Sequence, residues 1–143
     1  MAKVRARTAE NTGSHWLRLW LPVAGYMALI FYLSSLPHPD EQLPKILFEK
    51  LGDKLLHIIE YAVLGFLFYR AFRRAAGSYA VEYAVVLAIA ASSMYGATDE
   101  MHQAFVPFRT STWSDWIADT AGAVIGVIGS RRVMERGVKG GIS

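Results

Sequence analysis

Two long stretches without a charged side chain dominate the sequence. Leu19 to Leu36 covers 18 residues and Tyr83 to Thr98 covers 16, and neither contains Asp, Glu, Lys or Arg. A soluble domain of this length would alternate apolar with polar residues at the period of a helix or a strand. Apolar runs of about 18 to 20 residues instead match the thickness of a bilayer core. The sequence therefore predicts a small multi-pass membrane protein.

Composition agrees with a single apolar domain that has no separate soluble module. Hydrophobic residues make up 53% of the chain and charged residues 19%, so few positions remain for a polar surface. The chain has no cysteine, which excludes disulfides and thiolate chemistry. The net charge of +3 is modest, so the positions of the charges say more than their sum. We expect membrane lipids as neighbours and no nucleic-acid partner.

The predicted fold is all-α, a compact bundle of four transmembrane helices over residues 15–134. Flexible cytoplasmic tails are expected at 1–14 and 135–143, and a short interfacial helix within 46–52. We expect the spans at residues 16–36, 53–73, 79–103 and 113–133. A signal peptide is a competing interpretation of the basic start, but the first apolar run is too long for one.

Basic residues predict how the bundle is oriented. Eleven of the fifteen lie in the N-terminal segment to Arg18, the turn at 70–74 and the C-terminal end. The remaining four lie in or beside the connections at 37–52 and 104–112. Because Lys and Arg accumulate on the cytoplasmic side, both termini are expected there and the two connections outside.

Polar side chains gather at the predicted outer ends of the last three spans. They are Asp53, Lys54, His57, Glu60 and Tyr61, then Tyr95, Asp99, Glu100, His102 and Gln103, then Asp115 and Asp119. Steps of three or four residues place 53/57/60, 95/99/102 and 115/119 each on one helix face. Polar groups are costly in an apolar setting, so this layer predicts a functional pocket open to the outer face.

Some of these residues have structural explanations. Asp53 and Asp115 are placed to cap helices, and Thr112-x-x-Asp115 fits a capping box, so capping and function are weighed equally for both. Lys54 is expected to extend its ammonium to the interface. Asp119 lies nearly two turns inside an apolar helix, beyond capping range, and is therefore interpreted as functional.

Arg109 precedes the fourth span by a few residues. A helix N-terminus together with an arginine forms a cradle for a phosphate or carboxylate. The alternative is a salt bridge to a neighbouring acid. Deeper in the same span, Ala118, Gly122 and Gly126 form a ridge of small residues that predicts close packing.

These residues carry a family resemblance. KLLHIIEYAVLGFLFYRA and SSMYGATDEMHQAFVPFRTSTWSDWIADTAGAVIG resemble the VanZ-like membrane family, over roughly residues 50 to 130. The motif positions are Asp53, Lys54, His57, Asp99, Glu100, Gln103, Arg109, Asp115, Asp119 and Gly122. Many members have Gly where Phe108 stands and Asn where Asp119 stands. The resemblance implies a multi-pass protein of the bacterial cytoplasmic membrane, in a family associated with teicoplanin resistance.

Two functions follow as hypotheses. In the first, the outer pocket binds an anionic lipid headgroup or cell-wall precursor and affects glycopeptide susceptibility. In the second, the protein is a membrane-embedded enzyme, with or without a metal ion, because Asp99-x-x-His102 would face His57-x-x-Glu60. Structural and transport roles rank lower. We assign catalytic candidates at His57, Asp99, Glu100 and Asp119. Ligand-binding candidates are Asp53, Lys54, Glu60, Tyr95, His102, Gln103, Arg109 and Asp115.

Overall fold

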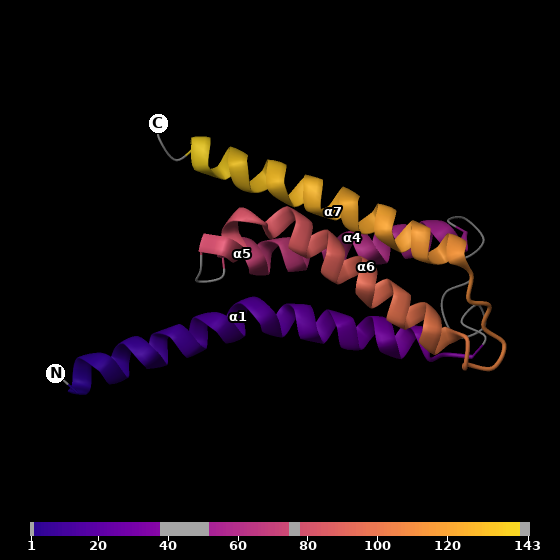
Figure 1. Ribbon diagram of the computed structural model, residues 1–143, viewed down its shortest axis with the longest axis horizontal. Coiled ribbons are helices and arrows are strands. Elements are labelled where there is room, and N and C mark those ends of the chain that lie inside the picture. Colours follow the sequence, from indigo (N-terminus) through magenta and orange to yellow (C-terminus); the bar gives the residue numbers. More distant parts are fainter. Residues whose placement is uncertain (1, 38–51, 75–77, 141–143) are drawn as a thin grey trace.

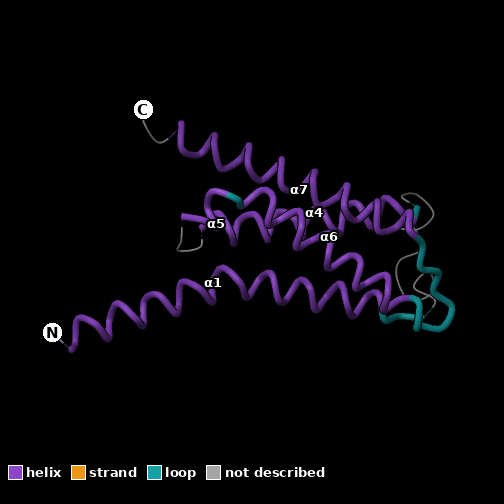
Figure 2. The backbone as a smooth tube through the Cα atoms, viewed as in Figure 1, coloured by secondary structure: helices purple, strands orange, loops and turns teal. Residues whose placement is uncertain are grey.

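The computed structural model describes residues 2–37, 52–74 and 78–140, and every regular element in these ranges is helical. The elements are α1 (Ala2–Ser34), α4 (Asp53–Arg74), α5 (Ser78–Glu82), α6 (Ala84–Gln103) and α7 (Trp113–Gly140). Figure 2 shows these helices running back and forth along one axis. The predicted helical class is confirmed.

The helix boundaries differ from the predicted spans in three places. Residues 2–14 and 135–140, expected as flexible tails, continue α1 and α7, and neither stretch contains a proline to end a helix. The third predicted span is divided at Tyr83, between α5 and α6. The interfacial helix expected within 46–52 falls mainly outside the described residues.

The start of α4 corrects the role expected for Asp53. The backbone N–H of Leu56 donates to the carbonyl of Gly52 at 3.3 Å, so Gly52 occupies the N-cap position. Gly52 has a φ of 71°, which glycine adopts at little cost. Asp53 is the first helical residue, where its carboxylate is still favoured by the helix dipole.

Helix α4 lies at the centre of the bundle. It contacts α1, α6 and α7, and its contact with α7 is the most extensive (Figure 1). Its fully buried side chains include Tyr61 and Leu64, and Ile30 of α1 and Val127 of α7 are buried in the same core. The termini lie at one end of the bundle, and the loop between α6 and α7 lies at the other.

Glycines allow α4 and α7 to approach backbone to backbone. A Cβ added at Gly65 would lie 2.5 Å from the carbonyl oxygen of Ala123. A Cβ at Gly122 would collide with the backbone of Ile58, and one at Gly126 with that of Ala62. The predicted ridge of small residues on α7 therefore packs closely against α4, as its spacing indicates.

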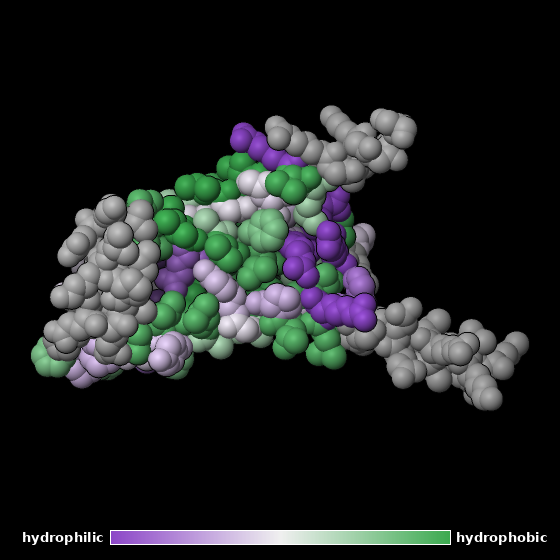
Figure 3. Space-filling model, turned by 180° about the vertical axis from the view of Figure 1, so that it is seen from behind, coloured by the Kyte–Doolittle hydropathy of each residue, from purple (hydrophilic) through white to green (hydrophobic). Residues whose placement is uncertain are grey.

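Apolar side chains cover much of the outer surface. Leu21, Val86, Met94, Ile117 and Ile125 are all more than half exposed. Figure 3 shows hydrophobic residues across the middle of one face, with hydrophilic residues towards the end that carries the termini. In the described ranges, His15–Ser34 and Asp53–Arg74 are long and apolar enough to cross a membrane. The acids near the end of α6 and the start of α7 lower the hydropathy of those helices.

We expect Gly122→Ala to lower the free energy of unfolding by about 1 to 3 kcal/mol, because the methyl group collides with the backbone of α4. Gly129→Ala is the matched control, since nothing lies within 4 Å of a Cβ there. The control should be neutral or stabilising by up to about 1 kcal/mol. Unfolding by sodium dodecyl sulfate in mixed micelles measures both, and equal effects would contradict the close contact.

Candidate functional site

The centre of the candidate site is a buried pair of side chains from α4 and α7. The His57 Nδ1 and Asp119 Oδ1 atoms are 2.8 Å apart, and Asp119 is completely buried. Gly122 lies three residues after Asp119, and its contact with Ile58 fixes α7 directly beside His57. The close helix contact therefore sets the geometry of this pair.

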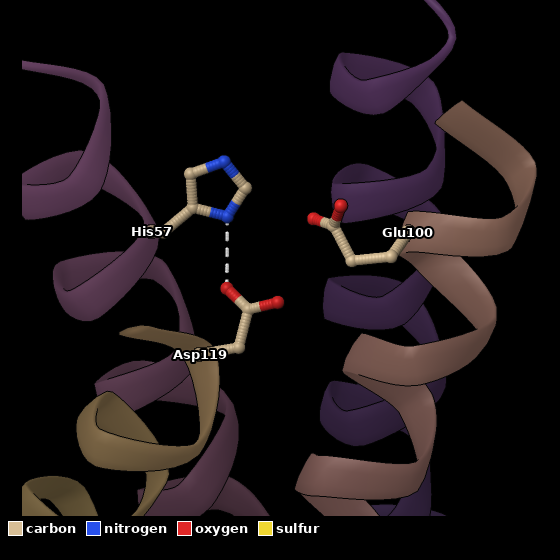
Figure 4. Close-up of side chains that lie close together, drawn as sticks. All are labelled: His57, Glu100 and Asp119. Atoms are coloured by element: carbon tan, nitrogen blue, oxygen red, sulfur yellow. Dashed lines mark hydrogen bonds and ion pairs between the residues drawn. The ribbon is translucent and has the colours of Figure 1, made fainter. Parts of the chain in front are cut away.

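Glu100 of α6 faces this pair from the other side (Figure 4). One ligand atom from each of His57, Glu100 and Asp119 can be chosen such that all three lie within 4.8 Å of one another. Three helices that are distant in sequence thus bring an imidazole and two carboxylates together. These residues were all assigned as catalytic candidates from the sequence.

Several oxygen atoms around this centre lack a hydrogen-bond partner. They are Oδ2 of Asp119, Oε1 of Glu100, Oδ1 of Asp99 and the hydroxyl of Tyr61. Each belongs to a side chain that is at least 93% buried. A buried polar group without a partner costs about 1 to 3 kcal/mol, and more when it is charged. Such groups in a folded protein indicate a partner that the polypeptide itself does not provide.

The second oxygen of Glu100 organises the loop before α7. Glu100 Oε2 accepts hydrogen bonds from Ser111 Oγ at 2.8 Å and from the Thr112 backbone N–H at 3.1 Å. In a capping box that N–H would bond to Asp115. The predicted capping box is therefore wrong, because Glu100 reaches across from α6 and takes the donor.

Asp115 is bound by other groups. Its Oδ1 lies 2.7 Å from Lys54 Nζ, and its Oδ2 accepts the Thr112 hydroxyl at 2.5 Å. Lys54 also donates to Ser114 at 2.6 Å, and 59% of its side chain is exposed. Lys54 thus joins α4 to the start of α7 with its ammonium near the surface, as its predicted interfacial position requires. Asp53 is exposed beside it.

Two predicted site residues on α6 face α1 instead. His102 Nε2 lies 3.0 Å from Ser35 Oγ and its ring contacts Phe31, while the Tyr95 hydroxyl donates to the Met27 carbonyl at 2.6 Å. They are two helical turns apart and form one stripe. Residues 95, 99 and 102 lie on one face of α6, as predicted, but Tyr95 and His102 at one edge of that face bind α1 rather than the site.

The adjacent side of α6 points into the site. Gly96, Asp99, Glu100 and Gln103 are all buried there, at steps that repeat every three to four residues. Gln103 Nε2 donates to Asp99 Oδ2 at 2.9 Å and so holds that carboxylate. Glu60 lies one turn beyond His57 on α4 and interacts electrostatically with His57 and Asp99.

Arg109 joins the loop to α1. Its Nη2 donates to the Leu33 carbonyl at 2.7 Å, at the C-terminal end of α1, where a cation is favoured. The salt bridge considered for Arg109 is absent from the ion pairs of the described residues. Its charge still interacts with Glu60, so Arg109 borders the site from the α1 side.

An open cavity of about 380 Å³ adjoins Glu100. It is lined mainly by apolar groups, and Ser111 and Thr112 contribute polar ones. The lining residues are Ala97, Glu100, Met101, Ala104, Ser111, Thr112, Trp113 and Trp116. Glu100 therefore links the buried centre to a space that is open to the outside.

Comparison with the sequence models of known protein families identifies the family of this chain. The sequence model of VanZ/LLP1 matches residues 7–134, which is most of the chain. The chain belongs to the VanZ/LLP1 family. No curated protein and no solved structure matched the chain. The VanZ-like resemblance inferred from the two motifs is thereby confirmed.

Phe108, which stands where many VanZ-like sequences have glycine, has an unusual backbone conformation in this VanZ/LLP1 chain. Phe108 has a φ of 64°, and among the described residues it is the one non-glycine with a positive φ. Glycine, which many VanZ-like sequences have at this position, adopts this conformation without strain. Phe108 therefore adopts a left-handed conformation that glycine would adopt without strain.

The sequence interpretation missed several residues that support the site. Ser111 binds Glu100, and Ser93 Oγ lies 2.8 Å from Thr120 Oγ1 between α6 and α7. Trp116 also donates its Nε1 hydrogen to the Ser93 carbonyl at 3.0 Å. The clustered hydroxyl residues at 110–112 were the available signal, because Ser and Thr gather at helix starts.

We expect Phe108→Gly to be more stable than Phe108→Val by about 1 to 2 kcal/mol, since a β-branched residue is strained at a positive φ. Both variants remove the aromatic ring, so its loss cancels in the comparison. The unfolding free energy in mixed micelles measures the difference. Equal stability would show that the turn has another conformation.

Proposed function

We propose that this VanZ/LLP1 protein is a four-span protein of the bacterial cytoplasmic membrane that binds an anionic lipid headgroup or a lipid-linked cell-wall precursor. The cavity beside Glu100 carries the proposal. Its mainly apolar lining suits an acyl or prenyl chain, while Glu100, Ser111 and Thr112 offer polar contacts for a headgroup.

Charged groups near the cavity fit an anionic headgroup. Lys54 is largely exposed, although it pairs with Asp115, and it can turn its ammonium towards a phosphate. With the termini in the cytoplasm, the cavity faces the outer side, where glycopeptides meet their cell-wall targets. We therefore propose that occupancy of the site affects glycopeptide susceptibility, including susceptibility to teicoplanin.

A second candidate function is an enzyme acting on the same lipid. The His57–Asp119 pair favours it, because a buried carboxylate that orients an imidazole is the arrangement used by general bases. In this version His57 takes a proton from a water or hydroxyl whose oxygen attacks the headgroup phosphorus. The phosphorus–oxygen bond to the leaving group breaks, and the His57 imidazolium returns the proton to the departing oxygen. Asp119 stabilises the imidazolium that results.

We expect Ala97→Phe to reduce the lipid retained on the purified protein at least tenfold, because the new ring fills the cavity. Ala90→Phe is the matched control, two turns away on the same side of α6 and outside the cavity lining. Native mass spectrometry with membrane lipids retained measures occupancy. The binding proposal fails if a folded wild-type protein retains no lipid, or if both variants retain it fully.

If the protein is an enzyme, the lipid identified in this way should be converted during incubation with the wild-type protein. His57→Gln should then lower the rate about 10² to 10⁴-fold, as expected when a general base is removed. His102→Gln should keep the rate within a few-fold, because His102 faces α1. Conversion that survives in the His57 variant, or that is absent from the wild type, would remove this candidate.

A further inference from the structure

The three-helix cluster of His57, Glu100 and Asp119 has features that lipid binding does not explain. All three residues are at least 93% buried, and their ligand atoms lie within 4.8 Å of one another. Figure 4 shows the carboxylate of Glu100 directed across a gap towards the other two. A hydrogen bond joins His57 to Asp119, but Glu100 reaches neither of them with one.

Carboxylate oxygen atoms in this cluster lack a hydrogen-bond partner, and a bound cation would give them a partner. Asp119 Oδ2 and Glu100 Oε1 have no hydrogen-bond partner, although the other oxygen of each carboxylate is hydrogen-bonded. Asp99 is also buried with one unpartnered oxygen, and it interacts electrostatically with Asp119. In each of these three carboxylates, one oxygen is therefore hydrogen-bonded and the other is buried without a hydrogen-bond partner.

The nearby basic side chains are engaged elsewhere. Lys54 pairs with Asp115, and Arg109 donates to the carbonyl at the end of α1. Among the described residues, the imidazole of His57 is the basic group that forms an ion pair within the cluster. Several carboxyl groups therefore face one histidine, and a positive ion would balance them.

Gly96 shapes the space beside the free oxygen of Asp119. A Cβ added at Gly96 would lie 3.0 Å from Asp119 Oδ2 and 3.2 Å from the ring of Tyr61. Any larger residue on α6 would press on this carboxylate. Glycine here keeps Oδ2 free to change its direction slightly.

The donor set identifies the class of ion. One imidazole nitrogen with two carboxylate oxygens suits first-row divalent metals such as Zn²⁺ or Mn²⁺. Ligand atoms bound at about 2.0 to 2.2 Å lie roughly 3 to 4 Å apart, so a separation within 4.8 Å needs only small side-chain movements. The nearby cavity provides a route of entry past Glu100.

We propose that His57, Glu100 and Asp119 bind one first-row divalent metal ion between α4, α6 and α7. The site deepens the proposed function, because an ion held at Glu100 would present positive charge to an anionic headgroup in the adjoining cavity. Metal binding itself does not require the lipid. The two proposals can therefore fail separately.

Cobalt provides the test. Protein purified with a chelator and reconstituted in lipid nanodiscs should bind one equivalent of Co²⁺, seen by visible absorption, and Zn²⁺ should displace it. His57→Gln, Glu100→Gln and Asp119→Asn should each weaken binding at least about tenfold. Glu82→Gln, which removes an exposed acid on α5, should bind like the wild type.

Three results would overturn the site. They are absence of Co²⁺ binding by the folded wild type, binding unchanged in all three ligand variants, and an equal loss in Glu82→Gln. If the ligand variants do not fold, Mn²⁺ bound to the wild type decides the question. Pulsed electron paramagnetic resonance should show coupling to a ¹⁴N nucleus from His57, and a signal without nitrogen coupling would reject the proposal. Lipid retention in the chelator-treated protein is measured separately and tests the binding function alone.

Discussion

The backbone contact between α4 and α7 is the constraint on which the site depends. Dispersion forces between helices grow as their axes approach, and lipid-facing helices have little other driving force for association. Gly65, Gly122 and Gly126 remove the side chains that would keep these two helices apart. The same contact sets the depth and rotation of α7, and with them the position of Asp119 against His57.

Polar groups inside this bundle act as connectors between helices. Glu100 ties α6 to the start of α7, Lys54 ties α4 to it, and Arg109 ties the intervening loop to α1. Each connection pairs a charged side chain with a helix terminus or with an opposite charge. The loop end of the molecule is therefore held by electrostatic contacts and the opposite part by apolar packing.

Much of this arrangement follows from local sequence, and the rest does not. The apolar runs predicted helices, and the spacing of small residues predicted the α7 contact. The steps of three and four brought out His57 and Asp119, and Glu100 was found as part of the polar layer at the same end of the predicted spans. The different partners along one face of α6 were missed, because local spacing does not show which neighbouring helix lies against each edge of that face. Only the position of α1 decides that His102 binds Ser35 while Asp99 points inwards. Likewise, Thr112-x-x-Asp115 is a correct local pattern that Glu100 overrides from a different helix.

Because the cluster draws one residue from each of three helices, its charges are compensated only late in biosynthesis. When α4 and α6 have left the ribosome, His57 and Glu100 are present, but Asp119 and the glycines of α7 are not. A folding intermediate in which α7 has not yet docked leaves His57 without its partner Asp119. The buried charges of the cluster can therefore be compensated only after the close contact between α7 and α4 has formed.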